Sequence, residues 1–350
     1  MKRSVSLILS IALLILVPIL AAQEETPESK PDFNRRYLVL STARHSTLEK
    51  ELKEAVAAGY QPIMGDAAYK ILLLEKKPES TPQREFIAVE NLHRGLKDAA
   101  GEGFRVIPTT VGIHEYSLAG VVEKAPGSRI HYEYLVLQPA RTSSLQKDIL
   151  EAAAQGYRPV AFAAAAGHAV VMERPAGLTA QPKSESATSG PPYLLLATSR
   201  SSTLQNELNA AVDKGYHVLL GTGGREIFLL LEKREANSPV PEYLVVATAR
   251  SGTLEEEINQ AVQRGFRLLP RTMAAVQKKA PLLGTYGFET TVVMEKVNAV
   301  TNAPKYLVIG TKRVNTFRKE LAEAEQQGYE VLGMMLSYEE QVTILAKAAR

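Results

Sequence analysis

Apolar residues recur along the chain in a fixed order that predicts the same small unit six times. Each unit opens with a short apolar run led by an aromatic residue, continues with a helical pattern, and ends in two further strand-like runs. In the first unit, the sequence from Leu48 to Val56 places Leu, Leu, Ala and Val at i, i+4, i+7 and i+8. This spacing forms one apolar stripe along a helix, and Gly59-Tyr60 predicts where that helix ends.

The distance from the opening aromatic residue to this glycine indicates that the units are copies of one another. It is 22 positions in five units, as from Tyr37 to Gly59, and 17 positions in the second unit, from Phe86 to Gly103. Because the aromatic residues that follow the glycines recur within strands, we expect them to be core anchors; the lining of a carbohydrate or peptide groove is the alternative. They are Tyr60, Phe104, Tyr157, Tyr216, Phe266 and Tyr329. The six opening aromatics are Tyr37, Phe86, Tyr134, Tyr193, Tyr243 and Tyr306.

The chain is therefore predicted to be an α+β protein of six tandem βαββ repeats, with the helices outside and the sheets packed inward. Units two and five share Phe-Arg-x-x-Pro, starting at Phe104 and Phe266, and both have a longer second hairpin. A linker rich in Pro, Ser and Gly, 175–192, separates units three and four. These features favour two lobes of three repeats, at 36–174 and 193–347, over a plain six-fold array.

The first and third strands are apolar at nearly every position, as at 38–40 and 72–74. Neighbouring side chains of a strand point to opposite faces of its sheet, so both faces have to be buried. We expect helices to cover one face. The other face then packs against another sheet or closes into a barrel-like core.

The opening Tyr-Leu-Val-Leu of 37–40, the helical stripe ending in Gly59-Tyr60 and the closing Leu-Leu-Glu-Lys of 73–76 resemble a family of short bacterial domains of unknown function. The resemblance implies one βαββ unit for each stretch of roughly 42 residues, and it implies no active site because the family has no assigned activity. This chain has Tyr or Phe where that family has Trp after the glycine.

The N-terminus has the features of a secretory signal peptide over 1–22. Lys2 and Arg3 precede an apolar run from Val5 to Val17, and Pro18 and small residues follow. A retained membrane anchor is the alternative interpretation. The polar, proline-containing segment 23–35 is predicted to be a disordered lead. The chain contains no cysteine, and an exported chain without disulfides favours a secreted or periplasmic bacterial protein.

One repeated polar pattern stands out. An arginine follows the first strand in five units, and an acidic residue follows seven positions later, while the second unit lacks both. We interpret each couple as a structural ion pair that ties a loop to its helix; the alternative is a repeated site for an anionic group. The pairs are Arg44 and Glu51, Arg141 and Asp148, Arg200 and Glu207, Arg250 and Glu257, and Arg313 and Glu320.

Serines and similar residues near these arginines, such as Ser46 three positions before Glu49, predict helix N-caps. The six histidines lie at unlike positions of the unit, so neither a metal nor a cofactor site is expected. The long hairpin of unit five departs from the repeat. It is therefore the predicted partner contact, through Lys278, Lys279 and Tyr286.

No motif assembles a nucleophile, a base and an oxyanion donor. The sequence therefore favours an exported, non-enzymatic repeat protein that acts as a binding or scaffold module. Its partner would be a protein or another component of the cell envelope, and no membrane contact is expected after signal cleavage. A net charge of +3 with mixed signs argues against nucleic acid. The alternatives are a hydrolase or transferase with a site between the lobes, and self-association through spare strand edges.

Overall fold

A computed structural model describes residues 32–177, 190–279, 286–297, 303–336 and 340–348. The predicted signal peptide and most of the linker 175–192 lie outside these ranges. The chain from Phe33 to Arg350 forms one compact unit. No helix in the described ranges is long and apolar enough to cross a membrane.

Within the described residues, six helices and 20 strands follow the predicted order of six βαββ units. The helices are α1 (His45–Ala57), α2 (Leu92–Gly101), α3 (Thr142–Ala154), α4 (Ser201–Asp213), α5 (Ser251–Gln263) and α6 (Val314–Gln326). The strands of units one to three are β1 (Tyr37–Ser41), β2 (Tyr60–Asp66), β3 (Ile71–Lys76), β4 (Glu85–Val89), β5 (Arg105–Val106), β6 (Gly112–His114), β7 (Ser117–Lys124), β8 (Tyr132–Leu137), β9 (Arg158–Ala164) and β10 (His168–Pro175). Those of units four to six are β11 (Tyr193–Thr198), β12 (Tyr216–Gly223), β13 (Ile227–Lys233), β14 (Tyr243–Thr248), β15 (Phe266–Leu268), β16 (Ala274–Lys279), β17 (Tyr286–Lys296), β18 (Lys305–Thr311), β19 (Glu330–Leu336) and β20 (Gln341–Lys347).

Each unit forms its own small antiparallel sheet, in which the last strand lies between the first and the second. In unit one, for example, β3 pairs with β1 from Tyr37 opposite Glu75 to Ser41 opposite Ile71, and it pairs with β2 on its other edge. In units two and five the second strand is interrupted by a single 3-10 turn, η1 (Pro108–Thr110) or η2 (Pro270–Thr272). This interruption is the lengthened hairpin that the sequence predicts.

Both ends of the helices have clear local causes. The glycines predicted to end them all have positive φ, from 83° at Gly328 to 91° at Gly103, a conformation that only glycine adopts without strain. The predicted N-caps are wrong. In the five longer helices the N-cap is the arginine, such as Arg44, and Ser46 lies inside the first turn.

A threonine two positions earlier helps to fix the start of four of these helices. The hydroxyl of Thr198 accepts a hydrogen bond from the backbone N–H of Arg200, and Thr248 and Thr311 act in the same way in units five and six. In unit one, Thr42 donates to the carbonyl of Arg44. These bonds fix the turn that leads into the helix, and none of the five longer helices has a side-chain hydrogen bond at its N-cap.

The hydrophobic core consists of six clusters, and each one joins two successive units. Leu38 and Leu72 on one face of the first sheet pack with the stripe of α1, as the sequence predicts. Val39 and Leu73 on the opposite face pack with Phe317 of α6. The second face of this sheet is thus covered by the helix of the preceding unit in the cycle, in place of the sheet or barrel wall expected from the sequence.

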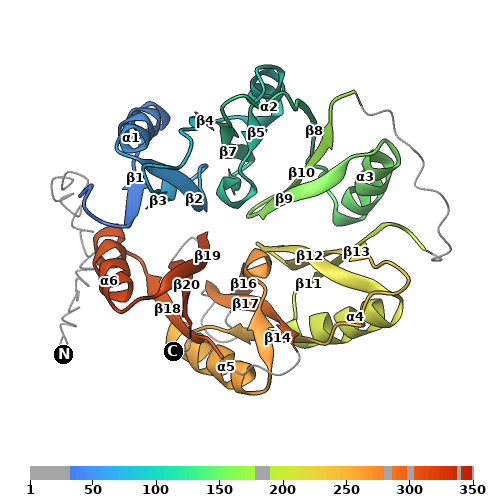
Figure 1. Cartoon of the computed structure of the whole chain (residues 1–350). Helices are drawn as coiled ribbons and strands as arrows, with labels where there is room; N and C mark the ends of the chain where they lie inside the picture. The colour runs from blue at the N-terminus through green and yellow to red at the C-terminus, as the bar shows by residue number, and fades with distance from the viewer. Residues whose placement is uncertain (1–31, 178–189, 280–285, 298–302, 337–339, 349–350) are drawn as a thin grey trace, which may run out of the picture. The chain divides into compact units, whose positions relative to one another are not determined.

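The same arrangement closes the chain on itself. Helices α1 to α5 each contact the first strand of the next unit, and α6 contacts β1. Figure 1 shows α6 beside β1, with the helices towards the outside and the hairpins towards the middle. The grouping into two lobes stays a prediction, since the contact between units three and four is built in the same way as the others.

The end of the predicted disordered lead is ordered in this structure. The ring of Phe33 lies 6.0 Å from that of Tyr60, and the carbonyl of Phe33 accepts a hydrogen bond from Lys76. The hydroxyl of Tyr60 donates to the carbonyl of Arg35. Residues 33–35 therefore extend the core of the first unit.

Candidate functional site

Four of the five predicted arginine–acid pairs are absent from the described residues, which include both members of each. No ion pair joins Arg141, Arg200, Arg250 or Arg313 to its own helix acid there. Each arginine is the N-cap, and its carbonyl accepts the first backbone bond of the helix, as Arg200 does from Leu204. The acid lies seven residues further on, nearly two turns and about 10 Å along the helix axis. The spacing places both residues on one face, but too far apart for a short contact.

A different helix position carries the contacts between units. The residue that directly follows the first leucine of the stripe reaches the exposed edge of the next unit's first strand. Gln205 of α4 donates to the carbonyl of Tyr243 at 3.1 Å and accepts from the N–H of Val245 at 2.7 Å. Gln146 makes the same pair of bonds to β11. These side chains satisfy backbone groups that an edge strand would otherwise leave open.

The same position closes the cycle of units. Glu255 of α5 accepts from Val308 on β18 at 3.0 Å, and Arg318 of α6 donates to the carbonyl of Val39 on β1 at 3.0 Å. Sequence reasoning missed this row because its residue types vary between units. Its one constant property is its place beside the buried stripe.

The opening tyrosines supply a second row of contacts between units. The hydroxyl of Tyr243 accepts from the N–H of Val218 in the preceding unit, and Tyr134, Tyr306 and Tyr37 accept from the equivalent N–H groups. In units one and three that position is Pro62 or Pro159, which has no N–H. The aromatic residue opposite Pro62 is Phe86, which has no hydroxyl. Four of the six opening aromatics therefore bond to the backbone of the neighbouring unit. The aromatic residues that follow the glycines, such as Tyr60 and Phe266, are buried core residues, as predicted.

The predicted partner contact in unit five is partly held inside the molecule. Lys278 donates to the carbonyl of Ser199 at 2.5 Å and lies 3.1 Å from a carboxylate oxygen of Glu289. The side chains of Lys279 and Tyr286 lie outside the described residues. The assignment of a partner to this hairpin stays a prediction.

The second strands of the units meet around a cavity of about 170 Å³. Four of these strands carry one extra residue at the same position of the unit: Ile63, Val160, Leu219 and Leu332. The other two are interrupted there by η1 and η2. All six units contribute to the wall, through residues such as Met64, Gly112, Phe162, Leu220, Arg271 and Met334.

The two 3-10 turns are held to their own sheets in the same way. The buried hydroxyls of Thr110 and Thr272 accept the N–H groups of Val121 and Val293, each at 2.9 Å. They differ at the middle residue, which is Thr109 in unit two and Arg271 in unit five. Each middle residue donates to the carbonyl of an extra residue: Thr109 to Ile63 at 2.6 Å, and Arg271 to Val160 at 2.7 Å.

Two ionisable residues line this cavity. Oδ1 of Asp66 accepts from the N–H groups of Ala68 and Tyr69 at 3.0 and 3.1 Å, a turn that closes the hairpin. Burial raises the pKa of Asp66 to about 7, although these N–H groups and the charge of Lys70 act in the opposite direction. The carboxylate lies against Gly112, where an added Cβ would come 1.7 Å from Oδ1.

Arg271 is the other ionisable residue of the wall. It stays accessible to solvent, yet surrounding protein atoms desolvate it enough to lower the pKa of its guanidinium. No carboxylate lies within ion-pair distance of it in the described ranges. A comparison of the twin motifs Pro108-Thr109 and Pro270-Arg271 would have revealed this residue from the sequence.

Metal ions need a set of clustered side-chain ligands. The described part of the chain contains no group of three or more His, Cys, Asp or Glu residues placed to hold an ion. No family model matches the chain, and neither does a curated protein or a solved structure.

Proposed function

We propose that the protein is an exported, non-enzymatic repeat protein that acts as a binding or scaffold module. The observation that supports this proposal most is where the repeated polar groups lie. The helix row and the tyrosine row bond one unit to the next, so the repeated chemistry stabilises the assembly of units. The ionisable side chains Asp66 and Arg271 belong to neither row. They lie in the wall of a cavity that is lined by all six units.

Ligand pockets of binding proteins are typically lined by apolar residues with a small number of placed polar groups. The residues that line this cavity are mostly apolar by type, and polar atoms supply about half of its exposed wall. The resemblance to short bacterial βαββ domains is compatible with such a role, since those domains have no assigned activity. The proposed export follows from the charged, apolar and small-residue pattern of 1–22. Fractionation of the source cells should place the chain outside the cytoplasm, shortened at its N-terminus.

The test of binding against turnover uses the mature chain, 23–350, and a small-molecule extract of the source cells. Mass spectrometry of the compounds retained by the protein should find molecules bound in no more than equimolar amount and released unchanged. Continuous loss of one compound with formation of another, beyond one molecule per chain, would show an enzyme and contradict the proposal.

One observation favours the second candidate, a hydrolase or transferase. The carboxyl of Asp66 opens on a cavity, and its pKa of about 7 is suited to accept and donate a proton at neutral pH. The variant Asp66→Asn separates the two candidates because its amide oxygen can still accept from Ala68 and Tyr69. An enzyme that uses Asp66 would lose turnover in this variant and keep its fold.

A further inference from the structure

We propose that the central cavity binds a small monocarboxylate with an apolar body, and that Arg271 pairs with the carboxylate. This inference rests on the proposed binding function and assigns a ligand class to it. It follows from three observations: the free hydrogen-bonding capacity of Arg271, the size and lining of the cavity, and the difference between Arg271 and its counterpart Thr109.

The first observation concerns the guanidinium. Its Nη2 donates to the carbonyl of Val160, a neutral acceptor, and no acidic side chain within the described residues forms an ion pair with it. A guanidinium carries five N–H donors, so most remain available to a ligand. A partly desolvated arginine with a planar fork of donors is well suited to hold a carboxylate by two parallel bonds.

The second observation concerns size and polarity. An apolar protein cavity of about 150 Å³ accommodates benzene. The volume of about 170 Å³ therefore fits a molecule of roughly six to nine non-hydrogen atoms. The wall contains Met273, Met334, Met335 and Phe162, whose side chains can pack against the apolar body of such a ligand, while polar atoms supply about half of the exposed wall.

The third observation is the departure from the repeat. The unit-two turn reaches the carbonyl of its neighbouring unit with the short side chain of Thr109. Arg271 instead reaches the carbonyl of Val160 in unit three, past unit four, and so brings a cation to the cavity. The bond to Val160 uses one of the five N–H donors of Arg271 and a neutral acceptor, so it does not by itself require the positive charge.

Asp66 does not cancel this charge. It forms no ion pair with Arg271, and Oδ1 is occupied by two backbone N–H groups. Burial raises its pKa to about 7, so near pH 6 the carboxyl is largely protonated. The wall then has a net positive charge, which favours an anion over an amine.

The experiment measures calorimetric binding to the full mature chain at pH 6 with butanoate and benzoate as probes. Butanamide and benzamide, which have nearly the same shape without the charge, are the matched ligands. We expect one site per chain and at least tenfold tighter binding of the carboxylates. Equal binding of acids and amides would overturn the inference, and so would the absence of carboxylate binding.

Two variants test the residue. Arg271→Thr copies the Pro-Thr-Thr turn of unit two, so it should fold, and it should lose at least tenfold in carboxylate affinity. Arg267→Thr removes an exposed arginine outside the cavity wall and should bind as the wild type does. Unchanged affinity in the Arg271 variant would refute the inference. The proposed binding function would still stand if the extract experiment found other compounds retained unchanged.

Discussion

Two contacts between units have a glutamate at the same position of the repeat. One contact joins units two and three, and the other joins unit six to unit one. In both, this residue belongs to the last strand of one unit and lies beside the second strand of the preceding unit. Between units two and three the glutamate is Glu173, which is fully buried and bonded to Nε and Nη2 of Arg105 at 2.9 and 2.8 Å. Arg158 and the hydroxyl of Tyr134 add two further contacts to it.

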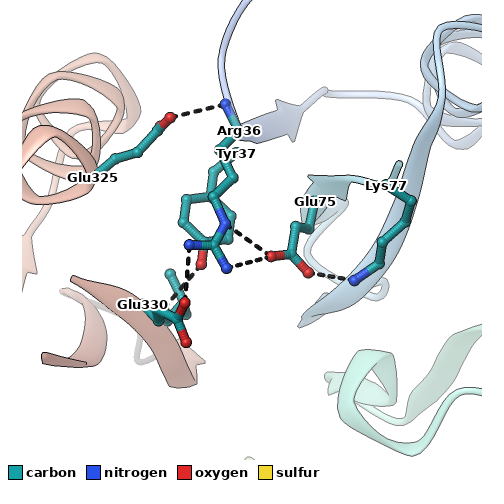
Figure 2. Close-up of polar contacts among 7 residues, drawn as sticks. Arg36, Tyr37, Glu75, Lys77, Glu325 and Glu330 are labelled. Carbon is teal, nitrogen blue, oxygen red and sulfur yellow. Dashed lines mark hydrogen bonds and ion pairs between the residues drawn. The ribbon is translucent and has the colours of Figure 1, made fainter. Parts of the chain in front are cut away.

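At the closing contact the residue equivalent to Arg105 is an acid, Glu330, so the repeat alone would set it against Glu75. Arg36, directly before β1, lies between them: its Nη2 is 2.8 Å from Glu75 and its Nη1 is 3.1 Å from Glu330. Figure 2 shows this arrangement, with Lys77 on the other oxygen of Glu75 and Glu325 bonded to the backbone N–H of Arg36.

The difference shows that copying a unit fixes the geometry of its contacts and leaves their charges to be set one by one. The geometry recurs because the apolar stripe, the glycine and the strands recur. The closing contact needs a cation that comes from outside the repeat, immediately before the first strand. The two contacts should therefore respond differently to substitution and to pH.

The largest expected effect comes from Glu173→Ala. This change removes the acceptor shared by Arg105, Arg158 and Tyr134, and we expect it to lower the free energy of unfolding by about 3 kcal/mol. The estimate lies at the low end for a buried ion pair because both arginines keep some access to water. Chemical denaturation at pH 7 measures it.

The matched control for this change is Glu133→Ala. Glu133 pairs with Arg174 on the surface of the same unit, so its loss should cost less than about 1 kcal/mol. Equal costs for the two variants would mean that burial of Glu173 adds nothing to the contact.

A smaller effect is expected at the closing contact from Arg36→Ala, about 1 to 2 kcal/mol at pH 7, because no cation then lies between Glu75 and Glu330, although Lys77 stays on the other oxygen of Glu75. The effect should depend on pH. Desolvation raises the pKa of Glu75, but hydrogen bonds from Lys77 and Arg36 outweigh it and hold that pKa below the ordinary value of 4.5. The stability that Glu75 contributes is therefore complete above about pH 4.5 and is lost as the pH falls through its folded-state pKa.

The cost of Arg36→Ala should consequently shrink below about pH 4.5, where Glu75 takes up a proton and its repulsion from Glu330 ends. Unfolding curves between pH 3 and pH 7 measure this trend. Arg84→Ala is the control, because Arg84 pairs with the single acid Glu123 within one unit. A cost for Arg36→Ala that stays constant over this range would contradict the role assigned to it.

The sequence was sufficient to predict the unit, its order of elements and the glycines that end the helices, because these depend on residues close together in the chain. It was insufficient for the contacts between units. The predicted arginine–acid pairs followed from spacing within one unit. The side chains that do connect units, such as Gln205 and Arg318, bond to backbone groups of another unit, which spacing within one unit does not reveal. The cavity was not predictable from any motif, since its wall is assembled from six segments and much of it is small or apolar.

The sequence shows that Pro62 has no N–H and that Phe86 has no hydroxyl. It does not show that the two residues face each other, so the match between the missing donor and the missing acceptor emerges only from the structure. This match leads to the smallest expected effect, which compares the tyrosines of the two contacts. Tyr134→Phe and Tyr37→Phe each leave a backbone N–H, of Val106 or Val331, without its acceptor, and each should cost about 1 kcal/mol. Tyr134→Phe should cost more than Tyr37→Phe, because the hydroxyl of Tyr134 also donates to Glu173 at 2.9 Å.

The control for these two changes is Tyr193→Phe, since the position facing Tyr193 is Pro159, which has no N–H to satisfy. Its hydroxyl makes a long contact of 3.4 Å with Glu232, so the variant should lose less than half as much stability as Tyr37→Phe. Thermal unfolding of the three variants under one condition measures the order. A loss in Tyr193→Phe equal to that in Tyr37→Phe would mean that the tyrosines stabilise the contacts through their rings alone, and that the pairing of hydroxyl with backbone N–H plays no part in how neighbouring units recognise each other.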